Sequence, residues 1–203
     1  FMNEVGPRSI LAGYPERVHV AFDANVVRLA KAWRGRFFDG SGVSSGRTDK
    51  FFDPLGKEVI NMPSGPAIAR LESQTSPWPK VEKTDRNIGG DFKGYELDEE
   101  ARPVFLYDIQ GVSVREQLLP VLEAGGANII RRFAISTSGT APDDLYLLVG
   151  EGDSIKKSGE SAWTVKDGQT LVLRGDGVSA ATVRSQGGKE QLLVPLTLRD
   201  GKA

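Results

Sequence analysis

Residues 92–114, FKGYELDEEARPVFLYDIQGVSV, decide the fold class of this chain. Two strand-like runs, at 92–97 and 104–109, flank a charged turn, and the second run alternates on one face through Phe105, Tyr107 and Ile109. Because successive side chains of a strand point to opposite faces, this alternation predicts a strand with one buried side. A Gln-Gly turn then leads into a third run at 112–118. The stretch therefore predicts antiparallel strands joined by short turns.

The C-terminal third continues the same rhythm of short apolar runs and turns. Asp167-Gly168 separates two such runs in SAWTVKDGQTLVLRG, residues 161–175, and Asp-Gly favours the positive φ angles of a tight hairpin turn. Further strands are expected at 129–136, 145–149, 180–184 and 190–198. We therefore expect an all-β fold, an antiparallel β-sandwich of many short strands.

Two segments leave the organisation of the chain open. Periodicity over 23–34 fits a helix capped by Asn25 or a strand, and the all-β surroundings favour the strand. Residues 72–91 are polar, and Pro on both sides of Trp78 forces extended backbone there, so a loop is expected. The chain is then a single β-sandwich domain over 1–203, or two abutting lobes, 1–71 and 92–203, joined by this loop.

Composition excludes several classes of partner and cofactor. The net charge is −1, which gives no electrostatic reason to expect nucleic acid or an anionic membrane as a partner. No apolar run approaches the ~20 residues that span a bilayer. The chain has no cysteine, so it cannot attach haem through thioethers, and one histidine, His19, is too few for a usual cysteine-free zinc site. His19 is expected to be a half-buried strand residue, and no cofactor or metal is expected in this chain.

Two motif-like stretches do not carry the chemistry that they suggest. DGSGVSSGRTD, residues 39–49, lacks the glycine spacing of a phosphate-binding loop, and Arg47 stands where such a loop has lysine. The adjacent acids Glu99/Glu100 and Asp143/Asp144 could in principle serve glycoside hydrolysis, but adjacent acids in loops are ordinarily solvated turn residues.

The aromatic residues offer the best candidates for a ligand site. A carbohydrate site combines an aromatic face with charged and amide groups. Trp78, in its Pro-flanked loop, and Trp33, beside Arg34 and Asp39, fit that description, with Tyr107 as a further candidate. A β-sandwich also needs large core residues at strand positions, so the core remains the alternative for these side chains.

Several strings, taken in order, carry a resemblance to a known group of proteins. They are GPRSI (6–10), GYP (13–15), AFD (21–23), RLAKAWRGRFFD (28–39), PLG (54–56), PSGP (63–66), PWP (77–79), FKGYELDEEARPVFLYD (92–108) and QLLVPL (191–196). Together they resemble a β-rich region of large secreted proteins of planctomycete-type bacteria, where it accompanies c-type cytochrome domains and often a sugar-dehydrogenase-like propeller. The stretch around 92–114 is also similar in style to galactose-mutarotase-like supersandwiches, a likeness of fold alone.

The resemblance implies a setting and leaves three functions open. The setting is the periplasm or cell exterior, with sugar oxidation, electron transfer and haem c on another domain or chain. In that setting this chain is expected to be a non-catalytic accessory module that docks other domains or positions substrate. The first alternative is a carbohydrate-binding module that uses surface Trp residues. The second is an enzyme of the sugar epimerase or lyase type, centred on Arg34, Asp39, Tyr107 or His19.

Overall fold

The computed structural model describes residues 2, 4–40, 53–81, 90–123, 126–166, 168–199 and 201–202. These residues form fifteen β-strands and one short 3-10 helix, η2 (Val178–Ala180). Every strand pairing is antiparallel. The prediction of an all-β, sandwich-like fold is confirmed.

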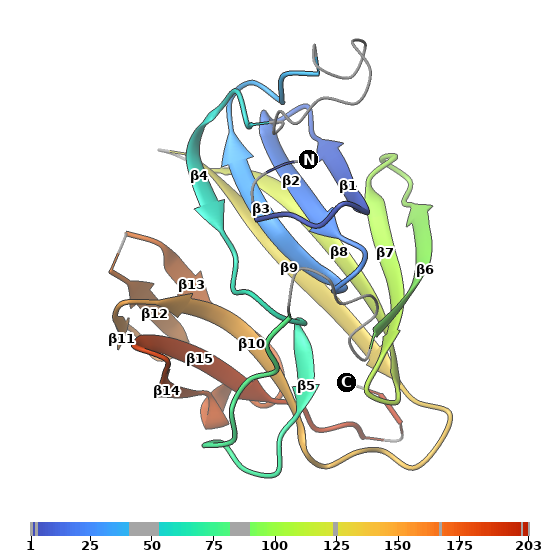
Figure 1. The fold of residues 1–203 in the computed structure, drawn as a ribbon, viewed down its shortest axis with the longest axis vertical. Coiled ribbons are helices and arrows are strands. Elements are labelled where there is room, and N and C mark those ends of the chain that lie inside the picture. The colour runs from blue at the N-terminus through green and yellow to red at the C-terminus, as the bar shows by residue number, and fades with distance from the viewer. Residues whose placement is uncertain are drawn as a thin grey trace.

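Two four-stranded sheets form the larger part of the molecule, and they lie one behind the other in Figure 1. The first sheet contains β1 (Ser9–Gly13), β2 (Val18–Asp23), β3 (Arg28–Arg34) and β4 (Lys57–Asn61). The second contains β6 (Gly90–Leu97), β7 (Pro103–Ile109), β8 (Val112–Glu123) and β9 (Gly126–Ser136). Both sheets follow chain order, and short connections join their neighbouring strands except for β3 and β4, which are separated by residues 35–56.

The core of this sandwich lies between the facing sides of the two sheets. Phe22 of β2 stacks on Phe105 of β7 with ring centroids 4.1 Å apart, and both side chains are fully buried. Val20 and Leu29 from the first sheet and Val114 from the second belong to the same cluster. Aromatic and branched side chains supply most of the apolar area that stabilises such a two-layer packing.

A second, smaller part lies beside the sandwich (Figure 1). One of its sheets has the order β14 (Thr182–Gln186), β15 (Lys189–Pro195), β10 (Leu145–Gly152), β5 (Ile68–Arg70). The other has the order β11 (Ile155–Lys157), β12 (Ala162–Val165), β13 (Thr170–Val172). A Cβ at Gly150 would lie 2.5 Å from Leu171 Cδ1, so glycine on β10 allows the three-stranded sheet to pack closely against it.

The sheets combine strands from both sides of the expected linker at 72–91. Strands β1–β4 pack against β6–β9, while β5 pairs with β10. Ile68 of β5 and Leu145 of β10 belong to the same hydrophobic cluster as Phe22, so the two parts share a core. Gly90 and Asp91, expected in the loop, already belong to β6. The number of independently folding domains stays a prediction.

The remaining sequence-based expectations differ from the structure mainly at element boundaries. Residues 24–27 form a turn and β3 follows, so the helix considered for 23–34 is wrong and the strand is confirmed. The strand expected at 180–184 begins only at Thr182, because η2 occupies 178–180. The Asp167 turn residue lies outside the described residues, as does most of the glycine-rich stretch 39–49.

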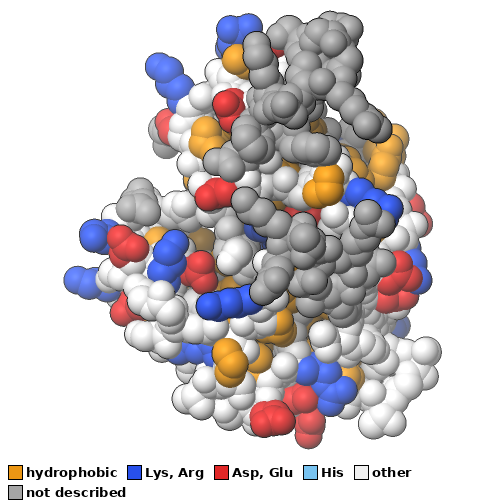
Figure 2. All heavy atoms as spheres, in the orientation of Figure 1, with side chains coloured by type: hydrophobic (Ala, Val, Ile, Leu, Met, Phe, Trp, Pro, Cys, Tyr) orange, Lys and Arg blue, Asp and Glu red, His pale blue; other side chains and the backbone are white. Residues whose placement is uncertain are grey.

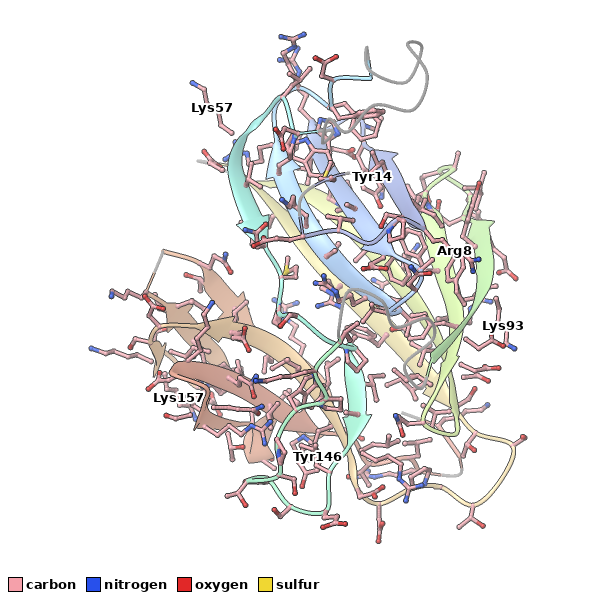
Figure 3. The ribbon with its side chains drawn as sticks, viewed as in Figure 1. Arg8, Tyr14, Lys57, Lys93, Tyr146 and Lys157 are labelled. Carbon is pink, nitrogen blue, oxygen red and sulfur yellow. The ribbon has the colours of Figure 1, made fainter. Side chains whose placement is uncertain are left out.

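The surface mixes charges of both signs. Figure 2 shows Lys and Arg side chains interspersed with Asp and Glu on the described part of one face, where hydrophobic side chains form small separate groups. Figure 3 shows Lys57 on β4 and Lys93 on β6 extending away from the sandwich. In the described ranges, no helix is long and apolar enough to cross a membrane.

Candidate functional site

Trp33 is a buried residue of the first sheet. Its side chain is 1 % exposed, and its indole Nε1 donates to the Phe37 carbonyl oxygen at 2.7 Å. It packs with Met2 and Val5 in a cluster separate from the sandwich core. Stacking on a sugar requires an exposed ring face, and Trp33 presents none.

The polar residues near Trp33 in the sequence and in space do not form a ligand site with it. Arg34 Nη1 pairs with Glu58 Oε2 at 2.7 Å on the surface, and Asp39 is exposed beyond the end of β3. His19 lies between Trp33 and Phe37, with ring centroids 5.6 and 5.0 Å away, and its Nε2 is 2.9 Å from the Gly35 carbonyl oxygen. Because a carbonyl oxygen only accepts, this nitrogen carries the proton and donates it.

Tyr107 points into the sandwich core rather than toward a ligand. It is 1 % exposed, and its hydroxyl donates to Glu116 Oε2 at 2.9 Å. Glu116 is fully buried and pairs with Arg131, whose Nη2 lies 2.8 Å from Glu116 Oε1. Burial, reinforced by the negative charge of Glu116, raises the pKa of Tyr107 well above its ordinary value. These three side chains form a buried polar network.

This network predicts a stability change at alkaline pH. Because the pKa of Tyr107 is raised in the folded state, its contribution is complete below about pH 10, where free tyrosine ionises, and is lost as pH rises further. We expect Tyr107→Phe to be less stable than the parent at pH 9, and the difference to shrink by about 1.4 kcal/mol by pH 11. Urea denaturation of both proteins at the two pH values measures this, and a difference that does not change with pH would contradict it.

Trp78 lies in the smaller part, against the sheet that contains β10 and β15. It is 3 % exposed and packs with Leu148 and Leu193. Its indole Nε1 donates to the Pro66 carbonyl oxygen at 3.1 Å, and its backbone N–H donates to Gln186 Oε1 at 2.8 Å. Trp78 is therefore a core residue, and part of it also lines a pocket on this sheet.

The segment that follows β5 runs back across β10 and β15 and covers one face of that sheet (Figure 1). Figure 3 shows Tyr146 of β10 beside β5, on the part of the sheet where this cover begins. Trp78 closes the apolar end of the covered face, where Leu193 lies opposite Leu148. Further along β15 the same face carries Gln191, which pairs with Glu151 of β10.

A polar pocket of about 160 Å³ opens at this point. We call it the Gln186 pocket, and its lining residues are Ser64, Trp78, Pro79, Lys80, Glu151, Gln186, Gly187, Lys189 and Gln191. The volume is small beside the roughly 300–1,000 Å³ of sites for drug-sized ligands. It suits one small polar unit, such as a single ring of a longer chain.

Strand register explains why polar groups converge on the Gln186 pocket. Glu151 of β10 pairs with Gln191 of β15, which pairs in turn with Arg184 of β14. Directly opposed residues share a face, so these three form a row across the sheet. Gln186 lies two residues after Arg184 and opposite Lys189, which places both on the same face as the row.

Arg184 fixes the orientation of both glutamines. Its Nη2 donates to Gln186 Oε1 and to Gln191 Oε1, each at 2.9 Å, and its Nε donates to Gln191 Oε1 at 3.1 Å. Its Nη1 donates to the carbonyl oxygens of Gln74, at 2.8 Å, and of Ser76. With the amide oxygens held by Arg184, the amide nitrogens are turned elsewhere: that of Gln191 donates to Glu151 Oε2 at 2.7 Å. Arg184 is thus a positioning residue behind the pocket.

The loop at 63–66 holds the other wall of the Gln186 pocket in place. Gly65 has φ +92°, a left-handed conformation that favours glycine. A Cβ there would lie 2.6 Å from the Pro79 carbonyl oxygen and 3.1 Å from Trp78 Cδ1. Glycine at this position allows the loop to approach the two residues of the wall closely.

A second, much smaller cavity of about 10 Å³ lies where the two parts meet. Arg28, Pro63, Arg131 and Leu148 are among its lining residues. Arg28 Nη1 donates to the Pro63 carbonyl oxygen at 3.0 Å, while its buried Nε has no hydrogen-bond partner. The volume is enough for about one water molecule, so this cavity is not a ligand site.

Most of the site residues that the sequence suggested therefore lie outside the Gln186 pocket. Trp33, Arg34 and Asp39 lie at one end of the first sheet, Tyr107 lies in the sandwich core, and only Trp78 touches the Gln186 pocket. Sequence reasoning missed Glu151, Gln186, Lys189 and Gln191. The sequence held one signal for this site. Gln191 is the first residue of the apolar run QLLVPL, and a polar side chain that is buried with such a run needs a hydrogen-bond partner.

Comparison with known proteins adds one match. Residues 20–116 match the model of a family described as a domain of unknown function, DUF6797. The matched segment is just under half of the chain and runs from β2 into β8. It includes Ser64, Trp78, Pro79 and Lys80 of the Gln186 pocket but none of its residues on β10, β14 and β15. No curated protein and no solved structure matches the chain.

The described part of the chain offers no cluster of side chains suited to bind a metal ion. Within it, no group of three or more His, Cys, Asp or Glu residues is arranged to hold a metal ion. The Gln186 pocket itself offers amides, ammonium groups, one carboxylate and a hydroxyl. Such groups bind by hydrogen bonding and charge.

Proposed function

We propose that this chain is a non-catalytic binding module and that the Gln186 pocket binds one sugar unit of a glycan. The observation that carries this proposal is the fixed orientation of Gln186 and Gln191 by Arg184. A sugar hydroxyl both donates and accepts, so its site needs donors and acceptors held in place. Here Gln186, Lys189 and Ser64 supply donors and Glu151 supplies an acceptor, beside the wall formed by Trp78.

A binding role is favoured over the epimerase or lyase alternative by how the candidate groups are distributed. Epimerases and lyases act through an acid and a base at one site. Glu151 is the one carboxylate among the described residues that line the Gln186 pocket, and these residues include no His or Tyr. His19 and Tyr107, the acid–base candidates from the sequence, are buried in two different clusters of the sandwich. These observations support a site that holds its ligand without transforming it.

The resemblance stated above supplies the proposed setting. In a secreted or periplasmic protein that oxidises sugars and passes electrons to a c-type cytochrome, such a module would hold a glycan near the catalytic domain. Haem would then belong to another domain or chain, since this chain has no cysteine to attach it. In this proposal the chain serves as an accessory module because it binds the glycan.

Replacing Gln186 by alanine tests the proposal. We expect the 203-residue chain to bind at least one oligosaccharide on a glycan array, and Gln186→Ala to weaken that binding about tenfold, because one oriented amide is lost. Gln169→Ala, in the turn between β12 and β13, is the matched control and should bind as the parent does. Failure of the folded chain to bind any glycan would overturn the proposal.

A further inference from the structure

We infer that the ligand of the Gln186 pocket is an anionic sugar, one that carries a carboxylate or a sulfate group. This inference rests on the proposed function and narrows it from glycans in general to acidic ones. It is carried by the charged side chains of the described residues around the pocket, among which cations outnumber anions.

The first observation is the environment of Arg184. Its guanidinium donates five hydrogen bonds, and every acceptor is a neutral oxygen, either a backbone carbonyl or a glutamine amide. Partial burial lowers the pKa of Arg184. Because no carboxylate is among the acceptors of these five hydrogen bonds, an anion nearby would add a favourable charge–charge interaction with this cation.

The second observation is the set of charged side chains that line the pocket. Lys80 and Lys189 bring two ammonium groups, against the single carboxylate of Glu151. Part of that carboxylate is already engaged, since Glu151 Oε2 accepts from Gln191. Among the described residues, Lys80, Lys189 and Arg184 thus give three cations around a pocket that is lined by one anion. Concave walls focus such an imbalance into a positive potential inside the pocket.

The third observation concerns hydrogen-bonding capacity. With both glutamine oxygens occupied by Arg184, the pocket offers mainly donors: the Gln186 amide nitrogen and the ammonium groups of Lys80 and Lys189. A carboxylate or sulfate accepts several hydrogen bonds and donates none, and bonds to a charged acceptor are the stronger ones. The excess of hydrogen-bond donors and the positive potential therefore both favour an anionic ligand.

The test compares oligosaccharides that differ only in charge. Isothermal titration of the 203-residue chain would use a galacturonate oligosaccharide, its fully methyl-esterified form, and a sulfated galactose oligosaccharide with its desulfated counterpart. We expect a charged member to bind about tenfold more tightly than its neutral partner, and this advantage to shrink as salt is added. Whichever pair shows the advantage identifies the anion as carboxylate or sulfate.

Lysine variants locate the effect. Lys189→Gln should weaken binding of the charged oligosaccharide about two- to fivefold and leave the neutral one unchanged. Lys156→Gln on β11 is the matched control, an exposed lysine outside the pocket, and should change neither. If charged and neutral forms bind equally, the inference is wrong while the proposed function stands. If none of them binds and the glycan array is also empty, both are wrong.

Discussion

Replacing Trp78 by alanine is expected to lower the free energy of unfolding by about 3–5 kcal/mol and to abolish ligand binding. The side chain is 3 % exposed among Leu148 and Leu193, so truncation leaves a cavity that this packed face can only partly close. The Pro66 carbonyl oxygen also loses the indole N–H that it accepts. The Gln186 pocket loses its apolar wall in the same step.

Urea denaturation followed by tryptophan fluorescence measures this loss, and two further variants interpret it. Trp78→Phe refills most of the volume without the N–H, and it should recover at least half of the stability. Val172→Ala on β13 changes an exposed side chain and should have an effect within about 0.5 kcal/mol. A Trp78→Ala protein as stable as the parent would mean that this indole is not part of the core.

Replacing Glu116 by alanine is the second substitution with a large expected effect, again about 3–5 kcal/mol. Glu116 is fully buried, and it is the acceptor for the Tyr107 hydroxyl and the ion-pair partner of Arg131. Removing it leaves a phenol without its acceptor and a largely buried guanidinium without its counter-charge. Such groups cost much more when orphaned than the intact network contributes.

The charge and the hydrogen bonds of Glu116 can be separated by a second variant. Glu116→Gln keeps an acceptor for Tyr107 but removes the negative charge, so its loss of stability should fall between that of Glu116→Ala and the parent. Glu100→Ala, at an exposed turn, is the control. Chemical denaturation at neutral pH compares all three, and a loss below about 1 kcal/mol for Glu116→Ala would contradict the account of this network.

The sequence predicted β7 and the start of β8 well because each has one buried face. Along β7, Phe105, Tyr107 and Ile109 are buried in the sandwich, so the period of two is visible in the sequence. Strand β3 has no such signature, because all five of its central residues, Lys31 included, are buried. A strand covered on both faces loses its alternation, which is why 23–34 could also be taken for a helix.

The candidate site could not be predicted because its members meet only through long-range pairing. Glu151, Gln191 and Arg184 become neighbours when β10, β15 and β14 align, and no local spacing encodes that register. The cover over this face comes from residues about a hundred positions earlier, through contacts such as that of Trp78 with Gln186. Trp33 and Trp78 attracted attention as large aromatics, and the structure uses both for packing.

The most direct test of the central claim is a titration followed by ¹H–¹⁵N NMR of the glutamine side chains. The galacturonate and sulfated galactose oligosaccharides and their neutral counterparts are added in turn to the labelled chain. The amide signals of Gln186 and Gln191 are followed with the backbone signal of Gly187. We predict that these signals shift together and saturate, while the backbone amide signals near Trp33 and Asp39 do not move. Saturating shifts confined to the Trp33 region, or none at any accessible concentration, would contradict it.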